Sequence, residues 1–385
     1  MTNIALEKIV PSEILAYNEL FAQTEGIHLL TIGAPDFDVP DFIKESGKKA
    51  IDDGFNGYSS SKGMPVLIDA FVHFLKRRYD LSYDTSHIIV TTGESQGLAA
   101  VLQALISPGD AVIIPTPAFP QYELCTLINH GEVVTVDTSH TQFILTPEAL
   151  RQAKINHPNA KVVILNYPSN PTGVTYSPED LKAFAKTANE LDLIVISDEI
   201  YSELVYDQKH DSIARYLPHR TILLNGASKT YAMTGWRIGF IACPPDLFTP
   251  IFKAHQSSTP VGSQFAHIAA ATAFNDGDAV IAMMKQAYQE RRDFIVKELS
   301  NMGFDVASPD GAFYVFPRIP QHLNMDDKKF ARELAVHGKV GVIPGSVFGK
   351  GGENYIRISY ATSMDILKES MERIRLFITN NQNTQ

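Results

Sequence analysis

The sequence predicts an α/β fold: a large doubly wound domain built on a mostly parallel sheet, joined to a smaller α+β domain. Short apolar runs recur along the middle of the chain, helical stretches separate several of them, and the last hundred residues follow another pattern. A chain of 385 residues also exceeds what one small core needs. We expect residues 45–280 to form the large domain and residues 1–44 and 281–385 to form the small one.

The predicted strands are runs rich in Val and Ile that are apolar on both faces. This pattern is typical of parallel strands covered by helices on both sides. The runs lie at residues 87–92, 111–115, 161–166, 193–197, 221–225 and 238–242.

Helical signals lie between these runs. Residues 177–191 begin with Ser177 as a predicted N-cap and Pro178 in the first turn, followed by two acidic residues near the positive end of the helix. Such alternation of strand and helix predicts the doubly wound arrangement.

The C-terminal part predicts a small α+β layer. Its expected elements are a helix near 279–302, a strand at 312–316, a helix near 327–337, a strand at 355–360 and a last helix from about 363. The segment around Pro35 and Pro40 is interpreted as a loop that crosses to this layer.

Composition excludes several classes of protein. The net charge of −10 argues against a nucleic-acid partner, because phosphate backbones are bound through clustered Lys and Arg. Cys125 and Cys243 fit no metal or redox spacing and indicate reduced thiols in a cytoplasmic protein. The N-terminus lacks signal-peptide features, and no run of about 18 apolar residues predicts a membrane span.

Polar residues follow four of the predicted strands. Ligands of open parallel sheets lie at the carboxyl ends of the strands, so these residues are expected to share a site. The segments are Gly93-Glu94-Ser95-Gln96-Gly97, Tyr167-Pro168-Ser169-Asn170-Pro171-Thr172-Gly173, Asp198-Glu199-Ile200-Tyr201 and Gly226-Ala227-Ser228-Lys229, with Arg237 eight residues beyond the last.

Each of these features has an ordinary explanation when taken alone. Lys229 alone would be a solvated surface lysine, Asp198 a helix N-cap, and the two glycine-containing segments simple turns. The combination favours a site, because unpaired charges gathered in a buried cleft would be strongly unfavourable.

The set of groups matches one kind of ligand. A helix start with small residues, a hydroxyl and an arginine suits a phosphate. An acid deep in the cleft can hold a protonated ring nitrogen, and a lysine among other cations is driven toward its neutral form, which adds to an aldehyde. Phosphate, ring nitrogen and aldehyde together describe pyridoxal phosphate.

Six stretches of the sequence resemble the class I/II pyridoxal-phosphate-dependent aminotransferases of fold type I, with the aspartate and aromatic aminotransferase subgroup the most similar. The stretch SKTYAMTGWRIGF is the most specific, and NPTG and PDF are weaker support. The stretches lie at residues 32–40, 57–67, 166–173, 197–201, 228–240 and 355–363.

The resemblance implies roles around the cofactor ring. Lys229 forms the Schiff base and, once released by substrate, moves the proton. Asp198 pairs with the ring nitrogen, while Asn170 and Tyr201 bind the phenolic oxygen. Phe119 stacks on the ring, at a position where relatives often have Tyr or Trp.

The resemblance also implies roles at the phosphate. Ser95, Ser228, Arg237 and the backbone of Glu94 hold it, and Tyr58 reaches it from the neighbouring subunit of a homodimer. Glu94 stands where a small residue is usual. An acid beside a phosphate is unfavourable unless its side chain points away.

At the substrate end, the resemblance places Arg357 on the α-carboxylate with the backbone of Gly33 beside it. The implied activity is transfer of an amino group from an L-amino acid to a 2-oxo acid by a ping-pong mechanism. No residue is assignable to a distal carboxylate, and Phe119, Tyr122 and Phe348 are expected near the cleft unless they are core residues.

These features favour aromatic or broad specificity, with aspartate and N-acetyl-diaminopimelate as alternative substrates. A carbon–sulfur β-lyase on the same scaffold is a further alternative. A regulatory protein that binds the cofactor as an effector is disfavoured, because the chain has no basic extension.

Overall fold

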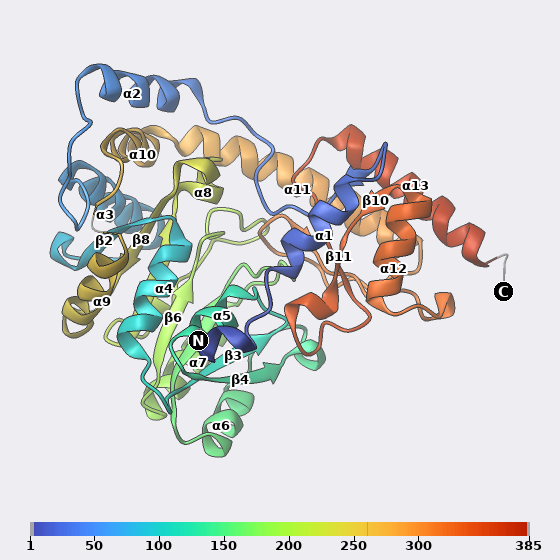
Figure 1. The fold of residues 1–385 in the computed structure, drawn as a ribbon, viewed down its shortest axis with the longest axis horizontal. Coiled ribbons are helices and arrows are strands. Elements are labelled where there is room, and N and C mark those ends of the chain that lie inside the picture. The colour runs from blue at the N-terminus through green and yellow to red at the C-terminus, as the bar shows by residue number, and fades with distance from the viewer. Residues whose placement is uncertain (1–3, 260, 383–385) are drawn as a thin grey trace.

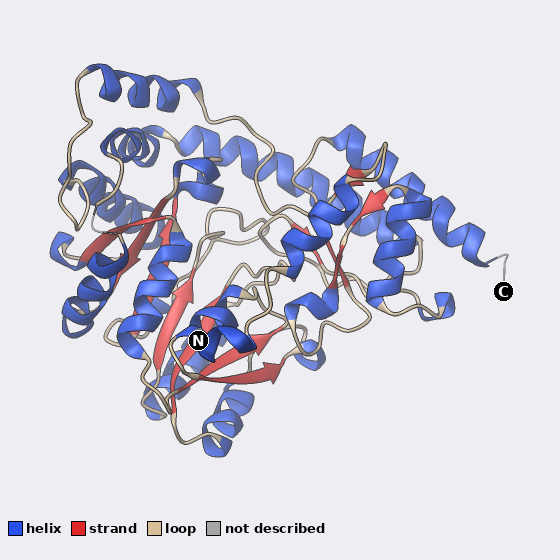
Figure 2. Cartoon of the chain, viewed as in Figure 1, coloured by secondary structure: helices blue, strands red, loops and turns tan. Residues whose placement is uncertain are grey.

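The computed structural model describes residues 4–259 and 261–382 and has a seven-stranded sheet as its largest element (Figures 1 and 2). The strand order is β2-β8-β7-β6-β5-β3-β4. Strand β8 is antiparallel to both of its neighbours, and the other pairs are parallel. The predicted α/β fold class with a mostly parallel sheet is confirmed. The strands are β2 (Ile88–Thr92), β3 (Ala111–Thr116), β4 (Glu132–Asp137), β5 (Ala160–Asn166), β6 (Ile194–Asp198), β7 (Thr221–Gly226) and β8 (Ile238–Ala242).

Six of these strands lie within two residues of their predicted bounds, and β4 was missed. It is the edge strand beside β3, and its residues are mostly half-buried or exposed. An edge strand lacks the continuous apolar run by which the central strands are recognised.

Helices cover both faces of the sheet. Successive strand residues point to opposite faces, so Ile88 packs in one cluster and Ile89 in another. One face is covered by α4 (Glu94–Leu105), α5 (Gln121–Ile128) and α9 (Pro245–Ser258). The other is covered by α2 (Asp41–Asp52), α3 (Pro65–Tyr79), α6 (Pro147–Asn156), α7 (Pro178–Glu190) and α10 (Gln264–Asp276).

Helix α7 shows why the local signals are reliable. Ser177 accepts a hydrogen bond from the backbone of Asp180, whose side chain in turn accepts from the backbone of Ser177. This capping box fixes the start of the helix where the sequence predicted it.

A second core lies beside the sheet domain. It contains a three-stranded antiparallel sheet in the order β11-β12-β9 and a parallel pair, β1 with β10. The strands are β1 (His28–Leu29), β9 (Tyr314–Val315), β10 (Val340–Gly341), β11 (Ile343–Pro344) and β12 (Ile356–Ser359). The helices around this core are α1 (Glu13–Ala22), α11 (Asp278–Asn301), α12 (Asp327–Glu333) and α13 (Met364–Gln382).

Two predicted elements here differ in detail. The strand expected at 312–316 is only two residues long, and α12 continues from Leu334 to Gly338 as a π-helix. The predicted domain boundary at 280/281 falls inside α11, and both proposed boundaries stay predictions. No helix in the described residues is both long and apolar enough to span a bilayer.

Candidate active site

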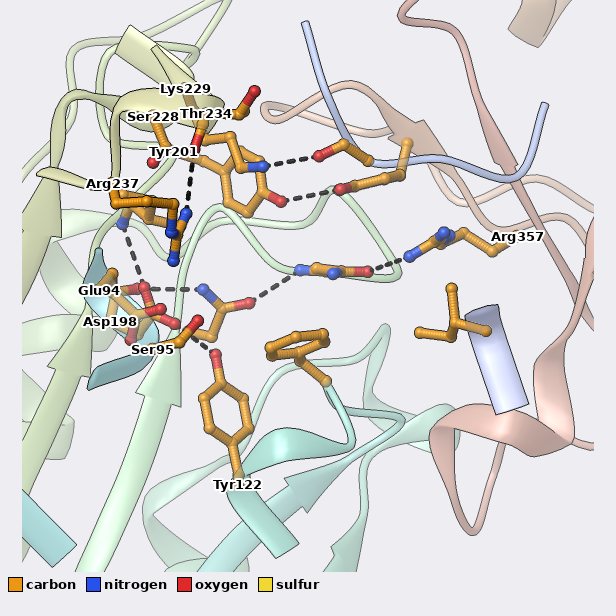
Figure 3. A pocket seen from close by; sticks show the side chains of 17 residues that line it. Glu94, Ser95, Tyr122, Asp198, Tyr201, Ser228, Lys229, Thr234, Arg237 and Arg357 are labelled. Carbon is orange, nitrogen blue, oxygen red and sulfur yellow. Dashed lines mark hydrogen bonds between the residues drawn. The ribbon is translucent and has the colours of Figure 1, made fainter. Parts of the chain in front are cut away.

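The carboxyl ends of the strands open into a cavity of about 210 Å³ (Figure 3). Eleven of the twelve predicted site residues line this cavity, and the side chains come from both cores. The eleven are Gly33, Glu94, Ser95, Phe119, Asn170, Asp198, Tyr201, Ser228, Lys229, Arg237 and Arg357. Their individual roles stay predictions.

Lys229 lies in the one-turn helix α8 (Ala227–Thr230), directly after β7. Its Nζ donates a hydrogen bond of 2.6 Å to the carbonyl of Gly33 and lies 5.9 Å from the ring centre of Tyr201. Burial lowers the pKa of Lys229 from 10.5 to about 8, and the charges of Arg237 and Arg357 act in the same direction against that of Glu94. A larger fraction of this amine is therefore neutral and nucleophilic near pH 7.

Asp198 ends strand β6 and is 2% exposed. Its Oδ2 accepts a hydrogen bond of 2.5 Å from Tyr122, and its Oδ1 accepts from the backbone N–H of Ile200. Burial raises the pKa of Asp198 to about 6. A carboxylate in this environment is stabilised by a cationic partner in the cavity.

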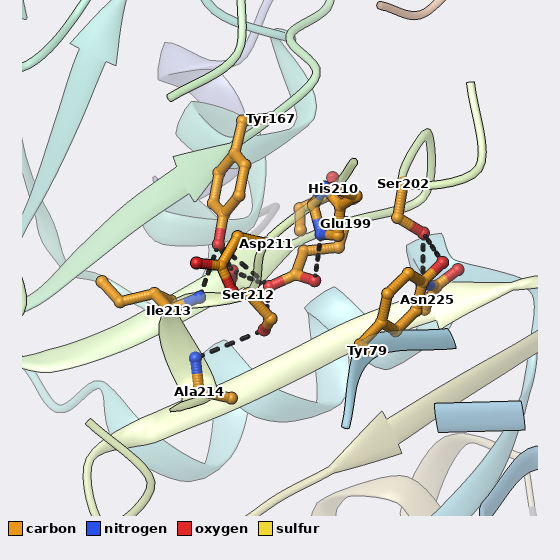
Figure 4. Close-up of polar contacts among 12 residues, drawn as sticks. Tyr79, Tyr167, Glu199, Ser202, His210, Asp211, Ser212, Ile213, Ala214 and Asn225 are labelled. Atoms are coloured by element: carbon orange, nitrogen blue, oxygen red, sulfur yellow. Dashed lines mark hydrogen bonds and ion pairs between the residues drawn. The ribbon is translucent and has the colours of Figure 1, made fainter. Parts of the chain in front are cut away.

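The next residue, Glu199, lies in a separate polar network behind the strand (Figure 4). Its carboxylate accepts from Ser197 and Ser212, each at 2.7 Å, and contacts Nε2 of His210 at 2.7 Å. Tyr167 donates to the same carboxylate at 3.1 Å. Glu199 is held in this network and does not line the cavity, whereas Asp198 does.

The start of α4 lines the cavity beside Asp198 and Arg237. Gly93 precedes the helix with a φ of 74°, and a Cβ at this position would lie 2.1 Å from Nη2 of Arg237. Only glycine lets the guanidinium come so close to the helix start. Arg237 donates to the carbonyl of Thr234 at 3.0 Å, and Ser95 and Ser228 lie beside it in the lining. Helix N–H groups, two hydroxyls and a guanidinium are suited to a phosphate.

Arg357 comes from β12 of the second core and is 2% exposed. It donates from Nη1 to Oδ1 of Asn170 at 2.9 Å and from Nη2 to the carbonyl of Thr31. Its Nε has no hydrogen-bond partner among the described residues. Phe348 packs its ring 5.0 Å from this guanidinium but does not itself line the cavity; it is a core residue, which is the alternative that the sequence left open.

Sequence reasoning missed two tyrosines. Tyr122 was considered only as an aromatic wall, whereas its hydroxyl holds Asp198. Tyr314 pairs its hydroxyl with that of Tyr201 at 2.8 Å and was not considered. Tyr122 lies six residues after the end of β3, in the first turn of α5, so a longer search from each strand end would have found it. Nothing local marks Tyr314.

The side chain of Glu94 lies in the cavity rather than pointing away from it. It is buried, and its Oε1 has no hydrogen-bond partner within the described part of the chain. Burial raises the pKa of Glu94 well above its usual value, as does the charge of Asp198.

Tyr58 is the one predicted site residue that lies elsewhere. Its side chain is 92% exposed and does not line the cavity of its own chain. Its predicted role in a neighbouring subunit stays a prediction.

Comparison with known proteins gives consistent matches. Residues 25–374 match the family described as aminotransferase class I and II. The chain is 42% identical over 379 residues to a probable N-acetyl-LL-diaminopimelate aminotransferase of Bacillus subtilis (strain 168), covering 98% of this chain and 96% of the relative. It is 38% identical to aromatic-amino-acid aminotransferase 2 of Thermococcus litoralis, covering 96% of each chain.

The structure is similar to that of aspartate aminotransferase from Thermus thermophilus with maleate. The TM-score is 0.93 at 33% identity, covering 98% of this chain and 99% of the other. Both the resemblance inferred from the sequence and the fold type are confirmed by these matches.

Proposed function

Because the chain belongs to the class I and II aminotransferases, whose family uses pyridoxal 5′-phosphate, we propose that it binds this cofactor among Asp198, Lys229 and Arg237 and works by a ping-pong mechanism. The main support is that the buried amine of Lys229, with its lowered pKa, shares one cavity with a buried acid and a guanidinium. In each cycle an L-amino acid gives up its amino group and a 2-oxo acid then receives it.

The residues of the cavity fit the parts of this cofactor. Ser95, Ser228, Arg237 and the start of α4 hold the phosphate, and Asp198 holds the ring nitrogen in its protonated form. When bound, the cofactor supplies an aldehyde for the amine of Lys229 and a ring that accepts electrons from the substrate. Phe119 covers the ring face, and its own ring stands edge-on to Tyr122 with centres 5.9 Å apart.

Near the phenolic oxygen, Asn170 and Tyr201 supply hydrogen bonds. The Oδ1 of Asn170 already accepts from Arg357, which leaves its amide N–H groups as donors. Lys229, once its nitrogen is free of the cofactor, holds and moves the proton of the substrate carbon.

Arg357 binds the substrate α-carboxylate. A guanidinium offers two parallel donors to a carboxylate, and Arg357 has a fixed orientation because the rings of Tyr314 and Phe348 pack against it. A carboxylate that approaches Arg357 replaces part of its present bonding to Asn170 and Thr31.

The cavity supports aromatic or broad substrate specificity. Among its described lining residues the only Lys and Arg side chains are Lys229, Arg237 and Arg357. The first two serve the cofactor and the third serves the α-carboxylate, so the described lining of this chain offers no further cation for a second carboxylate. Ile14 adds an apolar side chain to the lining.

We also propose a cytoplasmic homodimer in which Tyr58 completes the neighbouring phosphate site. A cavity of about 510 Å³ lies on the outer side of Arg237 and includes Trp236 and Phe265 in its lining. Tyr58 is 92% exposed, and this cavity includes Arg237 in its lining. We expect a second copy of the chain to cover both.

The deciding experiment is absorbance spectroscopy of the purified protein with added cofactor. The native chain is expected to show a near-ultraviolet to visible band of the lysine-bound cofactor that an amino acid donor bleaches. Lys229→Ala removes the band and lowers turnover by about 10²–10⁴-fold or more. A native protein without such a band contradicts the proposal.

Substrate choice is tested by a half-reaction screen that includes phenylalanine, tyrosine, aspartate and N-acetyl-LL-diaminopimelate. Faster bleaching by the aromatic donors is expected. Preference for the two dicarboxylic donors would overturn the proposed specificity. Release of pyruvate and ammonia from cystathionine without an oxo-acid acceptor would indicate a β-lyase instead.

A further inference from the structure

The side chain of Glu94 lies among the charged groups of the cavity but has no role in the proposed chemistry. It is the first residue of α4, next to the Ser95 hydroxyl, and its buried Oε1 has no hydrogen-bond partner in the described residues. A carboxylate buried with an unpartnered oxygen is strongly unfavourable, so Glu94 requires either nearby cations or a proton.

The charged and titratable groups that face Glu94 come from several elements. Lys229 and Arg237 favour its ionised form, while burial and the carboxylate of Asp198 oppose it. Tyr122 and Cys125 face it from α5 and are neutral, since burial raises the pKa of both thiol and phenol. The two cations and the positive start of α4 therefore keep a negative charge on Glu94 tolerable.

Both of these cations become engaged when the cofactor of the proposed function binds. The phosphate pairs with Arg237 and brings two negative charges to the helix start that Glu94 occupies. The cofactor, when bound, would also engage the amine of Lys229 through its aldehyde, so this nitrogen would no longer offer a free positive charge to Glu94. Loading the cavity thus removes the support for an ionised Glu94 and adds repulsion.

We propose that the Glu94 carboxyl takes up a proton as the phosphorylated cofactor binds and stays in the loaded cavity as a neutral acid, which makes retention of the cofactor weaken as pH rises. This inference rests on the proposed function. The direction follows from linkage: a group that binds a proton more tightly in the loaded protein favours loading at low pH. The affinity then falls by up to about tenfold per pH unit while Glu94 is ionised in the empty protein and protonated in the loaded one.

The test compares the native chain with Glu94→Gln, which keeps the shape of the side chain but cannot ionise. The dissociation constant of pyridoxal phosphate for each apoprotein is measured from pH 6 to pH 9 by the absorbance of the bound cofactor. Titration of the free cofactor is common to both proteins. The charge of Glu94 also raises the pKa of Lys229, so that pKa is measured in each apoprotein by amine labelling, and the remaining difference between the slopes reports Glu94. We expect the native constant to rise more steeply with pH, by up to about tenfold per unit.

Calorimetry provides a second readout that does not depend on activity. Binding is measured in buffers with different ionisation enthalpies, which gives the number of protons taken up. The native chain is expected to take up as much as one proton more than Glu94→Gln. If the dissociation constants of the native chain and of Glu94→Gln change equally with pH, and both proteins take up the same number of protons, the inference is overturned.

Two controls separate the possible failures. Glu123→Gln removes an exposed carboxylate from α5 and should keep the native slope, which excludes an effect of net charge. If Glu94→Gln does not fold by circular dichroism, Glu94→Ala replaces it, because it also lacks the acid. A native protein that shows no cofactor band contradicts the proposed function, whereas a native protein with the band but parallel slopes contradicts only the role of Glu94.

Discussion

The hydroxyl of Tyr122 donates a 2.5 Å hydrogen bond to Oδ2 of Asp198, and both side chains are at most 2% exposed. The bond joins α5 to the end of β6 across 76 positions of the chain. It stabilises the ionised form of a buried acid, since a hydrogen bond to a carboxylate opposes the effect of burial on its pKa.

Tyr122→Phe is therefore expected to raise the pKa of Asp198 further and to lower activity near neutral pH. A hydrogen bond to a charged group contributes about 1.5–3 kcal/mol, which corresponds to a loss of roughly 10- to 150-fold in kcat/KM. The loss should shrink as pH rises, because Asp198 must be ionised to hold a protonated ring nitrogen. The pH profile of the half-reaction measures this.

The matched control is Tyr216→Phe, which removes a tyrosine hydroxyl bonded to Asp211 outside the cavity. It should leave the pH profile unchanged. An unaltered profile for Tyr122→Phe would refute the role of this hydrogen bond.

The lowered pKa of Lys229 predicts unusual reactivity in the apoprotein. Acetic anhydride labels only neutral amines, so half-maximal labelling of Lys229 is expected near pH 8, whereas an ordinary lysine follows a pKa of 10.5. Labelling at each pH is quantified by peptide mass spectrometry, with exposed lysines of the same sample as internal controls. If Lys229 is labelled with the same pH dependence as the exposed lysines, the prediction is wrong.

Gly33 is predicted to tolerate no side chain. A Cβ there would lie 1.9 Å from the hydroxyl oxygen of Tyr314, whose ring is buried and whose hydroxyl bonds Tyr201. Gly33→Ala should cost about 1–3 kcal/mol of unfolding free energy and weaken cofactor binding. Denaturant unfolding measures the first effect.

Gly235→Ala provides the control, because no atom lies within 4 Å of its added Cβ. It should change the unfolding free energy by less than about 0.5 kcal/mol. Equal stability of the two alanine variants would contradict the crowding at Gly33.

Arg357→Lys retains a positive charge and loses the two-pronged geometry. We expect KM for the amino donor to rise by roughly 10- to 100-fold with little change in cofactor affinity, because the bidentate pair contributes mainly to carboxylate binding. Steady-state kinetics and cofactor titration separate the two effects. Arg375→Lys, in a partly exposed ion pair with Glu298, is the control for the chemical change itself. If the substitution raises only the dissociation constant of the cofactor and leaves KM unchanged, Arg357 does not bind the substrate α-carboxylate.

The proposed role of Tyr58 predicts complementation between two damaged chains. Lys229→Ala and Tyr58→Ala proteins are unfolded together and refolded as a mixture. A mixed dimer contains one intact site, with Lys229 from one chain and Tyr58 from the other, so activity should exceed that of either variant alone. Additive activities would indicate that Tyr58 does not act across subunits.

The central sheet and most of the candidate site were predictable from sequence for a physical reason. Buried parallel strands need continuous apolar runs, and polar residues directly after such runs must meet at one edge of the sheet. Asp198 and Lys229 each follow a strand in this way, so their proximity followed from the pattern.

Other features depend on contacts that a local pattern does not encode. The antiparallel direction of β8 is invisible in its run IGFIA, since an apolar strand has the same composition in either direction. The pairing of Tyr201 with Tyr314 joins residues 113 positions apart. The inward position of Glu94 depends on how the start of α4 packs against β8.

The hydrogen bond between Arg357 and Asn170 joins the two cores at the place where the proposed function puts the substrate α-carboxylate. The strand ends that would hold the cofactor belong to one core, whereas Ile14 and Tyr314, which would meet the substrate, belong to the other. We therefore expect substitutions at Ile14 to change the substrate end of the cavity more than the cofactor end. Substrate preference can then change through residues of the second core while the strand ends that would hold the cofactor stay the same. The differing substrates named for similar proteins agree with this.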